Sequence, residues 1–150
     1  MTAPAKTLRV IARATASAGL LDIAAAATLA VQAGGKPAAM LRGIASGPFP
    51  SATERKLAGA ALGLLVHFAI MAVVAAVFVL AYQRSQAIRA RPLAAGALYG
   101  ILVWLVMYFV VLAERWPKLY PSTDPTTIGI QLFCNIALVG LPIAIVTRRG

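Results

Sequence analysis

Asp22 and His67 are the two Asp, Glu, Lys, Arg or His side chains that stand inside the long apolar stretches of this 150-residue sequence. A carboxylate at the middle of a bilayer is disfavoured by roughly 2.5–3.5 kcal/mol on insertion scales, so Asp22 should face other helices and find a partner or take up a proton. Counted along two helices that run in opposite directions, Asp22 and His67 lie at a similar depth. The pattern therefore allows an Asp22–His67 contact, which would be an intramembrane proton or ion site.

Other side chains with polar atoms recur at one-turn spacing later in the chain. Trp104 and Tyr108 share one face of the third apolar stretch, and Gln131 and Asn135 share one face of the fourth. Two interpretations stay open: the groups bond one another and only fix helix packing, or they bind a ligand, a proton or an ion. The predicted polar cluster consists of Asp22, His67, Trp104, Tyr108, Gln131 and Asn135.

The sequence lacks the residue sets of several common chemistries. One histidine cannot supply two imidazole ligands to a haem, and the single cysteine, Cys134, can form neither an intrachain disulfide nor a metal-binding cluster. The sequence has no Gly-rich phosphate loop, no H-E-x-x-H motif and no nucleophile elbow, and Asp22 is the one carboxylate within an apolar stretch. We therefore expect no catalytic residue, no metal and no cofactor, and a protein that is not an enzyme.

The composition indicates which solvent surrounds the fold. Hydrophobic residues make up 61% of the chain and charged residues 12%, with a mean hydropathy of +0.84, whereas a soluble domain carries about 25% charged residues. The formal charge of +10 would suit nucleic acid, but the basic residues gather in short clusters between apolar runs, where lipid headgroups lie. The predicted partner is the lipid bilayer, and we expect no nucleic acid.

Four apolar stretches approach or exceed the ~20 residues that are needed to cross a bilayer. The first has a basic start and small residues near its end, like a cleaved signal peptide, but Asp22 interrupts it, so we expect a retained helix. The sequence predicts one all-α integral membrane domain over residues 1–150. Its transmembrane helices are predicted at residues 14–33, 57–82, 93–113 and 128–147.

Two connections between these stretches carry structural signals. Residues 37–47 have apolar side chains at the spacing of a short amphipathic helix, and Pro48 stops it, so we predict an interfacial or re-entrant helix, with a plain surface loop as the alternative. Within it, Arg42 is a candidate contact for a lipid headgroup, unless its side chain only snorkels to water. The short basic turn at 83–92 predicts that the second and third helices pack as an antiparallel hairpin.

Small residues mark the faces on which the helices should approach one another. On the second and third helices, a pair of glycines one turn apart precedes a polar residue on the same face, and this spacing lets helix backbones approach closely in lipid. We therefore expect His67 and Trp104 to point into the bundle. The predicted helix-packing residues are Gly59, Gly63, Gly96 and Gly100.

The distribution of Lys and Arg predicts the orientation in the membrane. With four helices, both termini lie on one side, and the side richer in Lys and Arg faces the cytoplasm. The side of the termini would hold Lys6, Arg9, Arg13, Arg84, Arg89, Arg91, Arg148 and Arg149. The other side would hold fewer: Lys36, Arg42, Arg55, Lys56, Arg115 and Lys118. We predict that both termini are cytoplasmic.

Four short motifs are spread over the chain: Leu-Arg-Gly-Ile-Ala-Ser-Gly at 41–47, Ala-Leu-Gly-Leu-Leu-Val-His-Phe at 61–68, Leu-Tyr-Gly-Ile-Leu-Val-Trp at 98–104 and Gly-Leu-Pro-Ile-Ala at 140–144. Together they resemble a family of small bacterial inner-membrane proteins that have four predicted helices and no assigned activity. The resemblance covers most of the chain, from about Gly19 to Ile145. It implies a bacterial plasma membrane and marks Arg42 and His67 as positions to test, but it implies no reaction.

These observations favour a non-enzymatic accessory or stabilising subunit of a larger membrane complex. The loops are too short for a soluble domain, and the glycine faces exceed what one bundle needs. The alternative is a small proton-linked transporter, acting as a homo-oligomer, that uses the pair of Asp22 and His67. A sensor or lipid-binding protein that uses residues 37–47 is a third hypothesis. The first two predict partner chains or further copies of this chain in the membrane.

Overall fold

The computed structural model describes residues 3–150, and this part of the chain is helical without strands. Four helical segments are long and apolar enough to cross a membrane: Pro4–Gln32, Lys56–Arg84, Pro92–Arg115 and Pro125–Arg149. The predicted all-α membrane fold is confirmed. Each segment begins before its predicted stretch because polar, charged or proline residues at its start continue the helix, and the backbone groups within each span are paired inside the helix, as lipid requires.

Two of the four membrane-spanning segments are single helices, α1 and α3. The third segment consists of α5, η2 and α6, and the fourth consists of α7, the π-helical turn η3 and α8. The bounds are α1 Ala3–Gln32, α2 Pro37–Ser46, η1 Pro50–Glu54, α3 Lys56–Arg84, α4 Gln86–Ala90, α5 Pro92–Val106, η2 Met107–Leu112, α6 Ala113–Arg115, α7 Pro125–Cys134, η3 Asn135–Gly140 and α8 Leu141–Arg149.

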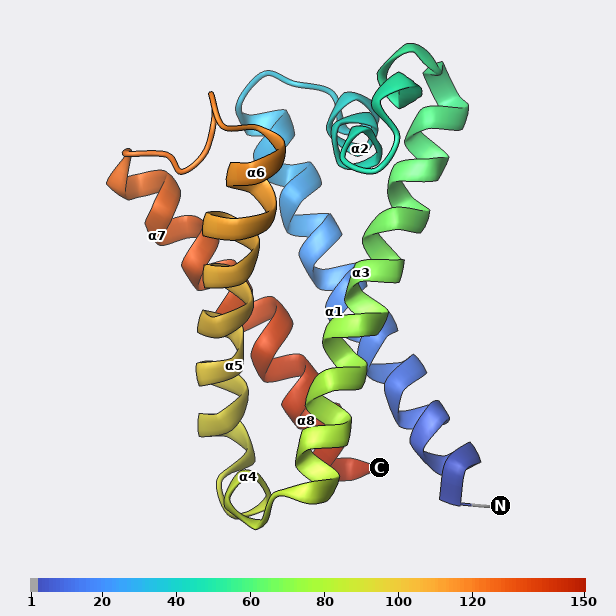
Figure 1. Ribbon diagram of the computed structural model, residues 1–150, viewed down its shortest axis with the longest axis vertical. Coiled ribbons are helices and arrows are strands. Elements are labelled where there is room, and N and C mark those ends of the chain that lie inside the picture. Colours follow the sequence, from blue (N-terminus) through green and yellow to red (C-terminus); the bar gives the residue numbers. More distant parts are fainter. Residues whose placement is uncertain (1–2) are drawn as a thin grey trace.

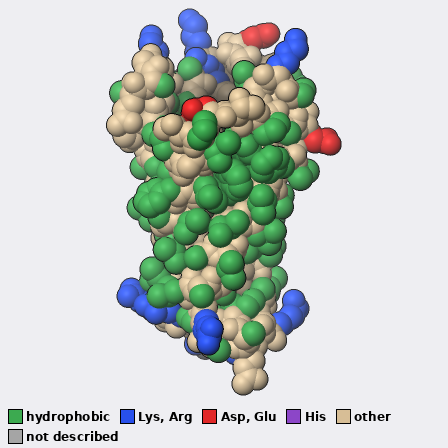
Figure 2. Space-filling view, turned by 90° about the vertical axis from the view of Figure 1, so that its left-hand side faces the viewer, with side chains coloured by type: hydrophobic (Ala, Val, Ile, Leu, Met, Phe, Trp, Pro, Cys, Tyr) green, Lys and Arg blue, Asp and Glu red, His purple; other side chains and the backbone are tan. Residues whose placement is uncertain are grey.

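The bundle has two distinct ends. Both chain termini and the α4 turn lie at one end, called here the termini end, while α2 and α6 lie at the opposite end, called the α2 end (Figure 1). On the face shown in Figure 2, hydrophobic side chains form a band across the middle of the molecule, and Lys and Arg side chains gather at both ends. This is the surface of a multi-pass membrane protein, with apolar side chains toward lipid and cations at headgroup level.

The core lies toward the termini end, where α1, α3 and α8 meet. Small side chains let these helices approach closely in lipid, where packing must supply much of the association energy. Larger side chains, led by Phe78 and Ile143, fill the remaining space. The buried cluster consists of Ala14, Ala18, Met71, Ala75, Phe78, Val139, Ile143 and Ala144.

The helices α3 and α5 run antiparallel from the α4 turn, as predicted, but they meet only near that turn. Tyr99 of α5 donates a hydrogen bond to the carbonyl of Val74 at 2.7 Å, and its ring lies 5.2 Å from that of Phe78. Toward the α2 end the two helices diverge (Figure 1). The main partner of α5 is instead the fourth segment: a Cβ on Gly100 would stand 2.8 Å from the Cα of Ile136.

The short helix predicted at residues 37–47 is present as α2. It lies across the end of the bundle between α1 and α3 (Figure 1). Gly63 of α3 lies against the backbone of Leu41, and Gly59 lies against the carbonyl of Ala52 in η1, so close that a Cβ at either glycine would overlap the neighbouring chain. The glycines of α3 therefore give α2 and η1 a place to pack.

Two π-helical turns interrupt the spans on the fourth and third segments. One of them, η3, ends two residues before Pro142, which has no N–H and cannot continue the regular α-helical hydrogen bonding. The other, η2, follows Trp104 and contains the buried Tyr108. Both turns border the site described next, and such wide turns occur often at functional positions.

Candidate functional site

A cavity of about 930 Å³ lies inside the bundle toward the α2 end. Its wall is built by residues of α1, α2, α3, α5, η2, α6 and α7, with Asn135 at the start of η3. Most lining side chains are aliphatic or aromatic, as Leu29, Ile44 and Val103 illustrate. The volume lies at the upper end of the range of small-molecule sites. This space can therefore hold a ligand with a sizeable apolar body.

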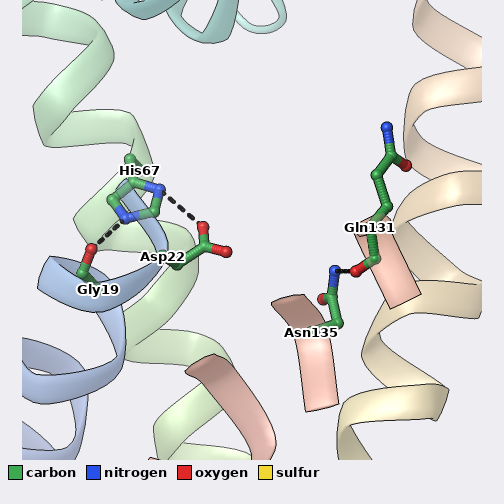
Figure 3. A network of polar contacts seen from close by, with 5 residues as sticks. All are labelled: Gly19, Asp22, His67, Gln131 and Asn135. Carbon is green, nitrogen blue, oxygen red and sulfur yellow. Dashed lines mark hydrogen bonds and ion pairs between the residues drawn. The ribbon is translucent and has the colours of Figure 1, made fainter. Parts of the chain in front are cut away.

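Asp22 of α1 and His67 of α3 lie side by side in the cavity wall. The Nδ1 atom of His67 is 4.0 Å from Oδ2 of Asp22. The Nε2 atom is 2.9 Å from the carbonyl oxygen of Gly19, one turn before Asp22 on α1 (Figure 3). The equal depth that the sequence suggested thus brings these two residues together, and Gly19 fixes the imidazole ring from the other side.

The Gly19 contact determines how the His67 ring is protonated. A carbonyl oxygen can only accept a hydrogen bond, so Nε2 carries the hydrogen and Nδ1 is the nitrogen that faces Asp22. With one proton between Nδ1 and the carboxylate the pair carries no net charge, and without it the pair is anionic. An uncompensated charge is costly at this depth, so the pair is a place where one proton can be held or exchanged for another cation.

Trp104 and Tyr108 form an aromatic wall on α5 and η2. Their rings stack with centroids 5.2 Å apart, and both side chains are buried. The Tyr108 hydroxyl accepts from the backbone N–H of Ser122 at 2.9 Å, which ties the loop after α6 to this wall. The Nε1 atom of Trp104 is buried and has no hydrogen-bond partner within the described part of the chain.

Gln131 and Asn135 line the cavity on the fourth segment, facing the Asp22–His67 pair across open space (Figure 3). Asn135 donates from Nδ2 to the backbone carbonyl of Gln131 at 3.0 Å. Within residues 3–150, neither residue forms a hydrogen bond with Asp22 or His67. The polar cluster that the sequence predicted is therefore divided over opposite walls of one cavity and does not close into a single network.

Arg115 and Trp116 are cavity residues that the sequence reasoning did not select. Arg115 of α6 donates from Nε to the carbonyl of Gly47 at 2.8 Å and from Nη2 to that of Ser46 at 2.9 Å, so its guanidinium caps the C-terminal end of α2. Trp116 lies next to Gly47 at the same place. The sequence signal was an Arg-Trp pair at a helix end, which headgroup anchoring explains equally well.

Arg42 does not line the cavity. Its stem packs near Gly59 of α3, and its Nη1 atom lies 3.4 Å from the carbonyl oxygen of Lys56. The other predicted packing glycines, Gly96 and Gly100, lie against Gly140 and Asn135 of the fourth segment. All four glycines thus contact other parts of the same chain.

Asp124 shapes the loop that borders the site, outside the membrane-spanning segments. Its carboxylate accepts hydrogen bonds from the Thr127 hydroxyl at 2.6 Å and from the Thr127 backbone N–H at 2.7 Å, so it caps the N-terminus of α7. These bonds, the one from the hydroxyl first, lower the pKa of Asp124 below its usual value because they favour the charged form.

Among the described residues, no group of three or more His, Cys, Asp or Glu side chains is placed to hold a metal ion. Comparison of the chain with protein families, with curated proteins and with solved structures gives no match. The resemblance to small bacterial inner-membrane proteins therefore stays a prediction. What the geometry itself presents is a large, mostly apolar cavity with the Asp22–His67 pair in its wall, inside a protein with four candidate membrane spans.

Proposed function

We propose that this protein is a small proton-linked membrane carrier that acts as a homo-oligomer in a bacterial plasma membrane. The observation that carries the proposal is the position of the Asp22–His67 pair, 4.0 Å apart in the wall of a cavity of about 930 Å³. A cavity alone would suit any ligand-binding protein. A group that can gain or lose a proton at its wall gives the bound substrate a means of coupling to a proton gradient.

Oligomerisation follows from the size of one chain. The large cavity lies between the helices toward the α2 end, while the termini end is filled by the packed cluster around Phe78 and Ile143. A substrate that enters from the α2 end must therefore cross a closed layer before it leaves. Movement of one chain against a second copy can open that layer more readily than repacking within a single chain, because packed cores are bistable and not continuously deformable.

The proposed orientation places the termini end in the cytoplasm and the α2 end outside. The termini end carries the larger set of Lys and Arg, including the cluster around Arg84 and Arg89, in agreement with the positive-inside rule. The cavity then opens from the outer half of the membrane.

The prediction of an accessory subunit of a larger complex stays open, but it has lost one of its arguments. The glycine faces that suggested a partner chain contact α2, η1 and the fourth segment of this chain. Purification in a mild detergent tests this prediction: an accessory subunit should bring down a distinct membrane protein in fixed ratio, whereas the carrier should elute as copies of this chain alone.

A flux assay tests the carrier. The purified protein is reconstituted into liposomes that hold a pH gradient, and uptake is followed for three probes: methyltriphenylphosphonium as a cation, anilinonaphthalene sulfonate as an anion and phenylnaphthylamine as a neutral molecule. We expect gradient-dependent accumulation of at least one probe. Asp22→Asn should abolish this flux, and His67→Ala should displace its pH profile.

The matched control is Asp124→Asn, which makes the same chemical change in a loop outside the cavity. It should leave the flux intact. The carrier would be refuted if protein-free liposomes and liposomes with each of the three variants all showed the same flux as the natural protein. A flux that does not depend on the pH gradient would also refute it.

A further inference from the structure

The group that the Asp22–His67 pair presents to the cavity is the carboxylate. The side chain of His67 is 7% exposed and is held from behind by Gly19, whereas that of Asp22 is 25% exposed. In Figure 3 the Asp22 carboxylate points from α1 toward the space between the two walls. A ligand in the cavity therefore meets an oxygen that can bear negative charge before it meets the imidazole.

The opposite wall also offers oxygen atoms. Asn135 uses its Nδ2 atom on the Gln131 carbonyl, which leaves its Oδ1 atom as an acceptor. Trp104 and Tyr108, whose rings stack on one another, also line the cavity, and most of the other lining side chains are apolar. Carboxylate, amide oxygen and aromatic faces together are the groups that stabilise an organic cation in a site with little water.

The one Lys or Arg side chain among the described residues that line the cavity, Arg115, already forms hydrogen bonds within the protein. Arg115 directs its guanidinium at the Ser46 and Gly47 carbonyls of α2. Asp22 is the one Asp or Glu side chain among the described residues that line the cavity. The ionisable groups that line the cavity are Asp22, His67, Tyr108, Arg115, Tyr120 and Cys134.

From these contacts we infer that the cavity binds a hydrophobic organic cation with one positive charge and exchanges it for one proton; this inference rests on the proposed carrier function. In the empty state one proton held between Nδ1 of His67 and the Asp22 carboxylate leaves the pair without net charge. When the cation binds against Asp22, that proton leaves the pair for water. Only the N–H or O–H bond to that proton breaks, and the pair together with its occupant has no net charge before and after the exchange.

The test uses tetraphenylphosphonium and the full-length protein in dodecyl maltoside. Equilibrium dialysis gives the affinity, and a pH indicator in weak buffer gives the protons released. We expect saturable binding with about one proton released per cation, and an affinity that falls about tenfold for each pH unit on the acid side, as linkage to one proton requires. Tetraphenylborate, which has the same shape and the opposite charge, should not compete.

Four variants divide the contributions. Asp22→Asn should remove both binding and proton release, while Asp124→Asn should change neither. Trp104→Leu should weaken binding by roughly 2- to 30-fold, the range expected for one cation–π contact. Phe133→Leu is its control because Phe133 is an aromatic residue that does not line the cavity and is 66% exposed.

The outcomes separate this inference from the carrier function. Any one of three results overturns the inference: competition by tetraphenylborate, binding without proton release, or equal binding to a normally folded Asp22→Asn, with folding checked by circular dichroism. If the liposomes accumulate anilinonaphthalene sulfonate instead of the cation, the proposed carrier function is supported and the inference of a cationic ligand is refuted. If tetraphenylphosphonium binds and releases a proton but no probe is transported, the cation-binding site is supported and the proposed carrier function is refuted.

Discussion

Single residues decide which chemistry is possible in the cavity. Asp22 and His67 each stand alone in an apolar stretch, so the sequence could identify them, and their equal depth made a contact possible. Gly19 could not be identified in this way, because the sequence does not indicate which backbone carbonyl of α1 meets the ring. Trp104 was selected as one of an aromatic pair, but that its Nε1 atom is left without a partner in the described residues follows from packing alone.

The cap of α7 gives a prediction for a single residue. Asp124→Ala should speed amide hydrogen exchange at Thr127 at neutral pH, because the helix N-terminus loses its carboxylate acceptor. The pKa of Asp124 is lowered in the folded protein, so the cap stabilises α7 above the usual aspartate pKa and fails as the pH falls through the lowered value. The difference between the variant and the natural protein should therefore disappear in acid.

Asp124→Asn is the control for this measurement. Asparagine is also a good N-cap, but it does not titrate, so exchange at Thr127 should stay slow and lose its added acid dependence. Identical exchange in the natural protein and in Asp124→Ala at neutral pH would show that this cap does not hold α7.

Helices and their contacts form the next scale, and here the glycines explain the arrangement. Their one-turn spacing indicated close contacts, and the structure assigns the partners: α2 and η1 on one side, the fourth segment on the other. The sequence could not assign them, because a glycine face fits the backbone of any helix that approaches it. The divergence of α3 and α5 belongs to the same scale, since α5 packs mainly on η3 and α8.

A pair of substitutions tests the packing of α2 against Gly63 of α3. Gly129→Ala should stabilise α7 by up to about 1 kcal/mol, since alanine favours the helix over glycine and a Cβ there would meet nothing within 4 Å. Gly63→Ala brings the same gain in propensity, but its Cβ would overlap the backbone of Leu41, so the thermal midpoint should fall. Circular dichroism in detergent measures both midpoints.

Limited trypsin digestion identifies which element is destabilised by the substitution. In Gly63→Ala the bond after Arg42 should be cleaved faster, because α2 no longer packs on α3, and in Gly129→Ala it should be cleaved at the natural rate. A rise in both midpoints would mean that α2 is not seated on Gly63.

At the scale of the whole molecule, the apolar band and the charges at the two ends relate the protein to the membrane. The apolar band and the terminal cations agree with a bilayer as solvent (Figure 2), and both termini lie at one end (Figure 1). From the larger number of Lys and Arg at that end we predict that a fluorescent protein fused after Gly150 is bright and that alkaline phosphatase fused there is inactive. The phosphatase inserted after Lys118, at the α2 end, should be active. The reverse pattern would invert the proposed orientation and place the cavity toward the cytoplasm.

The sequence alone determined that the chain is an all-α membrane protein, where the four spans lie and which polar side chains stand within them, and it favoured a short helix at residues 37–47 over a surface loop. These properties follow from local composition, because hydropathy, helix length and the positions of proline are read within one segment.

The tertiary structure decided which faces meet, and with them the cavity, the division of the polar cluster over two walls and the capping of α2 by Arg115. In lipid no hydrophobic force selects one apolar helix face over another, so the choice depends on how side chains far apart in the sequence interlock. That information is spread over the whole chain and is not contained in any one stretch.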